Sequence, residues 1–177
     1  KPALVFFDRT TSYRELHDQV ERLAAHLHQQ GVKAGDRVIL FMQNCPQWIV
    51  AHCAILRANA VVVPVNPMNR TAELRHYISD SGASTIVLPQ DLAAQILPLL
   101  EEGRRDGRGL QNVIVASYSD FLTKTGDLPV PEFVAAPRQR FDQAGVTAWC
   151  DMLTANRQPG ALTVGPDDLC VMPYTSG

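Results

Sequence analysis

Short apolar runs alternate with amphipathic segments along most of the chain. The apolar runs have the length of strands and cover residues 4–7, 38–42, 61–65, 85–88, 113–115 and 169–172. Segments with apolar positions three and four residues apart lie between most of them and predict helices over residues 12–31, 44–56, 71–82 and 91–100. Strands that alternate with helices of about ten to fifteen residues predict an α/β fold: a largely parallel sheet with helices on both faces.

Capping residues place the helix ends. Ser12 and Glu15 have the spacing of a capping box, in which each side chain accepts from the other residue's amide. Asn44 and Thr71 are expected to cap the next two helices. Pro98 is expected to limit the fourth helix, because proline has no amide hydrogen to donate, and residues 101–109 are expected to form a polar loop.

The region from residue 117 to 166 interrupts the alternation. Its five prolines are Pro129, Pro131, Pro137, Pro159 and Pro166. Within it, residues 146–153 have a short helical pattern. Because long irregular stretches are uncommon inside compact domains, we expect residues 117–166 to be an irregular excursion over the surface.

Composition and charge exclude several classes of protein. The 177 residues include 46% hydrophobic and 19% charged residues, which is ordinary for a globular domain with a sizeable core. Sixteen basic and eighteen acidic residues give a net charge of −2, so no nucleic-acid partner is indicated. No apolar run approaches the roughly 18 residues of a membrane span, and no signal peptide is visible. We therefore expect a cytoplasmic protein without a transmembrane segment.

Cysteines and histidines lack the patterns of reactive or metal-binding sites. The four cysteines, expected to be reduced and mostly buried, are Cys45, Cys53, Cys150 and Cys170. Cys45, close to a helix start, has two interpretations: a thiol with a lowered pKa or simply a half-buried side chain. His26 and His28 lie roughly 200° apart around a helix and cannot share a metal ion. No set has zinc spacing, so neither a metal site nor a catalytic residue is assigned.

The last apolar run leads into a polar turn. Pro173 ends the predicted buried strand of residues 169–172, and Tyr174-Thr175-Ser176-Gly177 follows. Free amides, two hydroxyl groups and a glycine are what a loop needs to wrap a phosphate. Taken alone, the same four residues also fit an ordinary polar turn after a strand.

Three motifs together resemble the adenylate-forming enzymes, the superfamily of acyl-CoA synthetases, luciferases and peptide-synthetase adenylation domains. Residues 174–177 (YTSG) resemble the opening of that family's phosphate loop, and residues 11–16 (TSYREL) resemble its early helix start. Residues 56–67 (LRANAVVVPVNP) resemble its second signature. Asn59 stands where the family usually has glycine, and asparagine is the next most tolerant residue of the left-handed conformation. The motifs keep the family's order and span nearly the whole chain.

The resemblance implies a reaction and its cofactors. A carboxylic acid would react with ATP, accompanied by Mg²⁺, to give an acyl-adenylate and pyrophosphate, and coenzyme A would then take the acyl group. Thr175, Ser176 and Gly177 are carried over as nucleotide contacts. The valine-rich motif looks most like fatty or aromatic acyl-CoA ligases.

The resemblance also implies that residues 1–177 form the N-terminal subdomain of an AMP-binding domain, truncated at the start of the phosphate loop. Its partners would be the rest of that domain, the acyl pocket included, and a C-terminal lid that carries a catalytic lysine. A homo-oligomer is a further option. We therefore expect the chain alone to be inactive. Two alternatives remain open: a non-catalytic α/β interaction module, and an adenylation domain or luciferase-like enzyme acting on another acid.

Overall fold

The computed structural model describes residues 1–123, 127–154 and 158–175, which form seven strands, six α-helices and two short 3₁₀ helices. The strands are β1 (Pro2–Phe6), β2 (Arg9–Ser12), β3 (Arg37–Phe41), β4 (Val61–Val65), β5 (Thr85–Pro89), β6 (Asn112–Ala116) and β7 (Val146–Ala148). The helices are α1 (Tyr13–Gln29), α2 (Pro46–Arg57), α3 (Thr71–Ser81), α4 (Ala93–Asp106), α5 (Glu132–Ala135), α6 (Trp149–Thr154), η1 (Gln90–Leu92) and η2 (Tyr118–Phe121).

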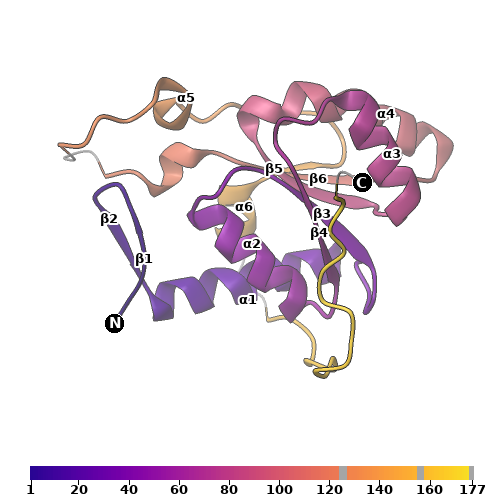
Figure 1. The fold of residues 1–177 in the computed structure, drawn as a ribbon, viewed down its shortest axis with the longest axis horizontal. Helices are drawn as coiled ribbons and strands as arrows, with labels where there is room; N and C mark the ends of the chain where they lie inside the picture. The colour runs from indigo at the N-terminus through magenta and orange to yellow at the C-terminus, as the bar shows by residue number, and fades with distance from the viewer. Residues whose placement is uncertain (124–126, 155–157, 176–177) are drawn as a thin grey trace.

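A five-stranded parallel sheet, in the order β4-β3-β5-β6-β7, lies at the centre of the molecule. Helices cover both of its faces, α1 and α2 on one and α3 and α4 on the other (Figure 1). Successive β3 side chains alternate between them: Val38 and Leu40 pack toward α1 and α2, whereas Ile39 and Phe41 pack toward α3 and α4. The predicted fold class is confirmed.

The predicted caps of the first three helices are confirmed in part. The capping box of α1 is confirmed, since the Glu15 amide donates to Ser12 Oγ at 3.2 Å and the Ser12 amide to Glu15 Oε2 at 2.6 Å. Asn44 does not cap α2; its neighbour Cys45 does, with Sγ accepting from the amide of Trp48 at 3.4 Å. Thr71 is the first residue of α3 rather than its cap. These two predictions were wrong by one residue each.

Helix α4 passes through Pro98 and continues to Asp106, so the predicted stop was wrong, and the predicted loop over residues 101–109 was right only for its last three residues. Tertiary packing explains the difference. Leu100 is 1% exposed, and a Cβ placed on Gly103 would stand 2.1 Å from the carbonyl oxygen of Leu110. Burial of this helical turn against the chain leading into β6 outweighs the hydrogen bond that proline removes.

The predicted helical segment over residues 146–153 begins instead as a strand. β7 pairs in parallel with β6, with Val146 opposite Val113, and α6 follows directly. Trp149, at the start of α6, is 1% exposed. Part of the region between residues 117 and 166 therefore belongs to the sheet and its core.

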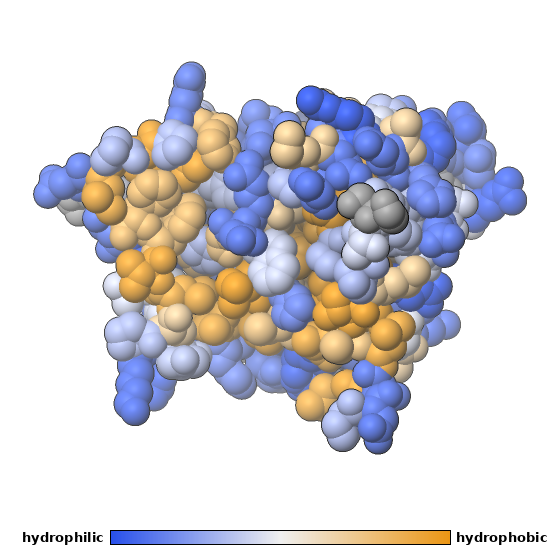
Figure 2. Space-filling view, in the orientation of Figure 1, coloured by the Kyte–Doolittle hydropathy of each residue, from blue (hydrophilic) through white to orange (hydrophobic). Residues whose placement is uncertain are grey.

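Apolar side chains also lie on the surface. Figure 2 shows an apolar surface that extends from the β1–β2 hairpin across α2 to the segment near the C-terminus. Val5 in the hairpin is 70% exposed, and Leu162 and Leu169 near the C-terminus are 60% and 62% exposed. Within the part of the chain that the structure describes, no helix is long and apolar enough to cross a membrane.

Candidate functional site

The carboxyl ends of the parallel strands meet at one edge of the sheet. From β3 the chain goes to β4 on one side and later to β5 on the other, so the strand order reverses next to β3. In open α/β sheets, ligands bind outside the carboxyl ends of the strands, near such a reversal. The loop after β4, which begins at Asn66, lies at this edge and is therefore the expected position of a ligand site.

The segment from residue 169 to 172 is not the buried strand that the sequence predicted. It makes a single parallel bridge, between Val171 and Val62 of β4. Two backbone hydrogen bonds form it: the Val62 amide donates to the Cys170 carbonyl at 2.9 Å, and the Met172 amide to the Val62 carbonyl at 2.8 Å. Leu169 and Cys170 are exposed, because the segment lies outside β4 at the margin of the sheet. Its parallel course nevertheless leads to the carboxyl end of β4.

Thr175 lines a cavity of about 490 Å³ at this end of the sheet. The lining residues come from β4, the loop after it, α3 and the C-terminal segment: Pro64, Val65, Asn66, Asn69, Tyr77, Tyr174 and Thr175. Ser176 and Gly177 lie outside the described residues. The structure thus places one of the three predicted contact residues, with an exposed side chain, at a cavity.

Tyr174 attaches the C-terminal segment to α3. Its hydroxyl group donates to Asp80 Oδ2 at 2.6 Å, and its ring centroid lies 4.4 Å from that of Tyr77. Burial, reinforced by the hydrogen-bonded carboxylate of Asp80, raises the pKa of Tyr174 to about 12. The phenol therefore stays protonated and keeps donating near neutral pH.

The loop after β4 is held by its own asparagines. Asn66 Oδ1 accepts from the amide of Met68 at 3.0 Å, and the Asn66 carbonyl accepts from the amide of Asn69 at 3.0 Å. Asn69 Nδ2 in turn donates to the hydroxyl group of Tyr77 at 2.8 Å. The loop, α3 and the C-terminal segment are thereby joined around the cavity.

The chemistry of the lining favours binding over catalysis. Among the described residues, its polar groups are two side-chain amides, two phenols and the hydroxyl group of Thr175. Such a lining offers donors to an anion without a facing negative charge. In the part of the chain that the structure describes, the lining has no carboxylate, histidine or lysine that could act as a general base.

Sequence reasoning missed Asn69, Tyr77 and Asp80 as site residues. The available signal was their spacing: Tyr77 and Asp80 are three residues apart and share a face of α3. Nothing in the spacing shows that Tyr174, which lies 94 positions after Asp80, meets that face.

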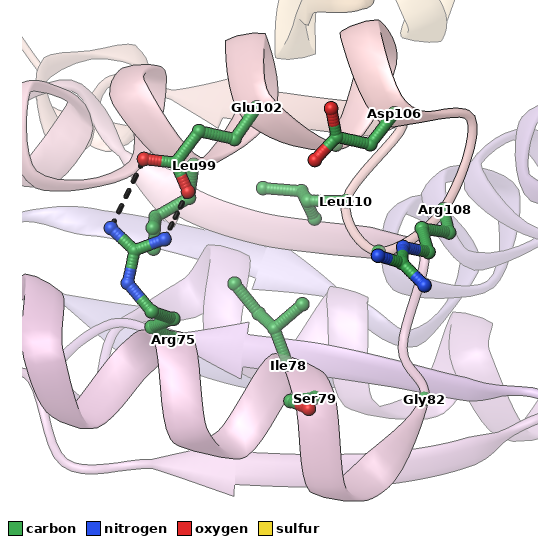
Figure 3. Close-up of a pocket in the computed structure, with 11 residues that line it drawn as sticks. Arg75, Ile78, Ser79, Gly82, Leu99, Glu102, Asp106, Arg108 and Leu110 are labelled. Atoms are coloured by element: carbon green, nitrogen blue, oxygen red, sulfur yellow. Dashed lines mark hydrogen bonds and ion pairs between the residues drawn. The ribbon is translucent and has the colours of Figure 1, made fainter.

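A second cavity, of about 580 Å³, lies between α3 and α4 near the amino ends of β5 and β6 (Figure 3). Ile78, Leu99 and Leu110 form its apolar part, and Arg75 forms a two-pronged ion pair with Glu102 across its rim. The hydrogen bonds from Arg75 lower the pKa of Glu102. The charges of Arg75 and Glu102 neutralise each other. We therefore assign this cavity to the junction of α3 and α4 and not to the candidate site.

Burial shifts the pKa values of Cys45 and His52, two groups of the α2 region that lie outside the candidate site. Burial raises the pKa of the Cys45 thiol to about 11, which excludes the lowered value considered from the sequence. Burial also lowers the pKa of His52. All four cysteines are free, but the expectation that most are buried was wrong, since Cys53 and Cys150 are half-buried and Cys170 is exposed. Across the described ranges, no cluster of histidine, cysteine and acidic residues could hold a metal ion.

Comparison with known proteins gives matches along the whole chain. A sequence model of the AMP-binding enzyme family matches residues 1–177. A long-chain-fatty-acid–CoA ligase of Escherichia coli O6:H1 is 38% identical over 124 residues, which are 70% of this chain and 21% of that protein. A salicyl-AMP ligase/salicyl-S-ArCP synthetase of Mycobacterium tuberculosis is 41% identical over 106 residues, 59% of this chain and 19% of that protein.

Solved structures show the same fold. An anthranilate–CoA ligase in complex with anthranoyl-AMP superposes with a TM-score of 0.72 at 22% identity, covering 100% of this chain and 29% of that one. The chain thus spans about a fifth of the curated relatives, 21% of the E. coli ligase.

Proposed function

The chain belongs to the family of AMP-binding enzymes, and from this premise we propose that it is part of a ligase that activates a carboxylic acid with ATP and passes the acyl group to coenzyme A. ATP, bound with Mg²⁺, would supply the adenylyl group that activates the carboxylate. The observation that carries the proposal is the position of Thr175, at a cavity on the carboxyl edge of a parallel sheet, within a chain that the family model matches throughout.

The role of this chain's residues is to bind and orient phosphate. The Thr175 hydroxyl group, and with it Ser176 and Gly177, would donate to the β- and γ-phosphates of ATP. The residues present fit such an anion, because amides and hydroxyl groups line the cavity and no carboxylate does. Tyr174 fixes the start of the loop through Asp80 and Tyr77.

A fatty acid is the acid that the comparisons favour. The E. coli relative, which covers more of the chain than the mycobacterial one, is a long-chain-fatty-acid–CoA ligase. The salicyl-AMP ligase, at 41% identity, favours an aromatic acid as the second candidate. The acid-binding residues would lie in the rest of the ligase.

Residues 1–177 would form the N-terminal subdomain of the AMP-binding domain and pack against the remainder of that domain. The apolar surface over the hairpin, α2 and the C-terminal segment supports such packing (Figure 2).

Four unpaired cysteines support a cytoplasmic location.

The test is acid-dependent exchange between pyrophosphate and ATP, measured on the longer polypeptide that contains this chain. We expect exchange with fatty acids, weaker exchange with salicylate, and none with residues 1–177 alone. Thr175→Val should lower the exchange about tenfold and Thr175→Ser should restore most of it, because the hydroxyl group is the phosphate donor. Absence of exchange with every acid tried would refute the ligase and favour the non-catalytic interaction module.

A further inference from the structure

Residues 160–164, here called the strap, lie near the end of the irregular region and lead toward the segment that carries Thr175. The strap has no regular secondary structure, and four of its five residues are exposed. Three side chains, from α1, the last residue of α2 and the turn before β4, nevertheless bind its backbone. Arg57 Nη1 donates to the carbonyl of Gly160 at 2.8 Å, and His28 and Asn59 make the remaining contacts.

Asn59 binds the strap with both ends of its amide. Nδ2 donates to the carbonyl of Ala161 at 2.9 Å, and Oδ1 accepts from the amides of Thr163 at 2.7 Å and Val164 at 3.3 Å. Asn59 is 7% exposed as a residue, and its three bonds to the strap are partly buried. The backbone of Asn59 is left-handed, at φ 61°, which confirms the predicted turn. Glycine would keep the turn and lose all these side-chain contacts.

His28 connects the same turn to the strap. One ring nitrogen, Nε2, lies 3.1 Å from the carbonyl of Ala58, and the other, Nδ1, lies 3.1 Å from the amide of Gly160. A neutral ring with its proton on Nε2 satisfies both contacts, since Nε2 then donates and Nδ1 accepts. Arg57, the third anchor, is itself held by Glu21 at 2.7 and 3.1 Å.

The strap leads to the segment that pairs with β4, and this pairing by itself specifies its register only weakly. The segment leading to Thr175 meets β4 in one bridge, Val62 with Val171. A slip of one residue would move Thr175 by about 3.3 Å and turn the segment over. Asn59 stands two residues before β4 and holds the strap seven residues before Val171, so it anchors the segment before the bridge, while Tyr174 anchors it after the bridge.

We propose that Asn59, supported by His28, is a positioning residue for the phosphate loop: by holding the strap it sets the register of the segment that presents Thr175. This role rests on the function proposed above. It also gives a reason for asparagine rather than glycine at this left-handed turn, because glycine has no side chain to hold the strap.

The first test measures amide hydrogen exchange in residues 1–177, comparing the wild type with Asn59→Gly and Asn59→Asp. Glycine keeps the left-handed turn, and aspartate keeps the acceptor for Thr163 and Val164. We expect Asn59→Gly to speed exchange at these two amides and at Met172 by about tenfold, since each lost bond is worth two- to tenfold. Asn59→Asp should restore part of the protection at Thr163 and Val164, since it keeps their acceptor but replaces the donor to the Ala161 carbonyl with a second acceptor. Ile39, in the core, serves as the internal control for folding.

The second test measures ATP kinetics in the longer ligase. Asn59→Gly should raise the KM for ATP about fivefold with kcat changed less than twofold, and Asn59→Asp should have an intermediate KM because it keeps only the acceptor half of the contact. Unchanged exchange at Met172 in Asn59→Gly, or faster exchange with an unchanged KM, would overturn the positioning role. Wild-type protein that does not use ATP would instead refute the proposed function, while exchange at Met172 would still decide whether the strap sets the register.

Discussion

Tyr174 offers the sharpest test of how the C-terminal segment is attached. Tyr174→Phe removes the hydroxyl group that donates to Asp80 at 2.6 Å and keeps the ring that packs 4.4 Å from Tyr77. Asp80 is exposed, so its carboxylate would be rehydrated rather than left buried without a partner. The loss is therefore that of an ordinary hydrogen bond, about 1 kcal/mol.

The free energy lost should appear in local opening of the segment, because an exposed edge segment can detach without unfolding the core. The amide of Met172, which donates to the Val62 carbonyl at 2.8 Å, reports this opening. A loss of about 1 kcal/mol predicts exchange about fivefold faster at Met172. The rate at Val87, in the centre of β5, should not change.

A double-mutant cycle with Asp80→Ala assigns the effect to the pair. The two single variants and the double variant should all raise exchange at Met172 by similar factors, with a coupling of about 1 kcal/mol. Additive effects of the two substitutions, or a rate at Met172 that Tyr174→Phe leaves unchanged, would refute the attachment through Asp80.

Three further outcomes follow from buried groups. Gly103→Ala should lower the free energy of unfolding by about 2 kcal/mol despite alanine's better helix propensity, because its Cβ would meet the carbonyl of Leu110 at 2.1 Å; a melting temperature within 1–2 °C of wild type would contradict the close packing. Alkylation at neutral pH should modify exposed Cys170 well before Cys45, whose pKa burial raises to about 11; mass mapping of the adducts decides this. As the pH rises, the Cys45 thiol ionises in the unfolded chain before it ionises in the folded protein. The free energy of unfolding of the wild type, compared with that of Cys45→Ser, should therefore be constant below about pH 8.5 and fall by up to about 2–3 kcal/mol as the pH rises toward 11. The same pH dependence of unfolding for both proteins would refute the buried thiol.

The candidate site was predictable in part. The glycine-ending turn and the two upstream motifs pointed to Thr175, and the structure places that residue at a cavity. The cavity's other walls were not predicted, because they depend on where α3 lies. Tyr77 on α3 contacts Tyr174, and three strands of the sheet lie between these two residues in the sequence.

Features encoded within a few neighbouring residues were determined by the sequence itself. The alternation of strands and helices, the capping box of Ser12 and Glu15 and the left-handed turn at Asn59 are of this kind. Each depends on local propensity or on side chains that reach their own backbone, and such interactions need no distant partner.

Features that depend on distant partners were decided by the tertiary structure. Helix α4 continues through Pro98 because its next turns are buried, and residues 169–172 are exposed or only half-buried because they lie at the margin of the sheet. The hydrogen bond from Thr163 to Asn59 joins residues 104 positions apart, and that from Tyr174 to Asp80 joins residues 94 apart. No local pattern fixes such pairs, since only the packing of α2, α3 and β4 brings their atoms within hydrogen-bonding distance.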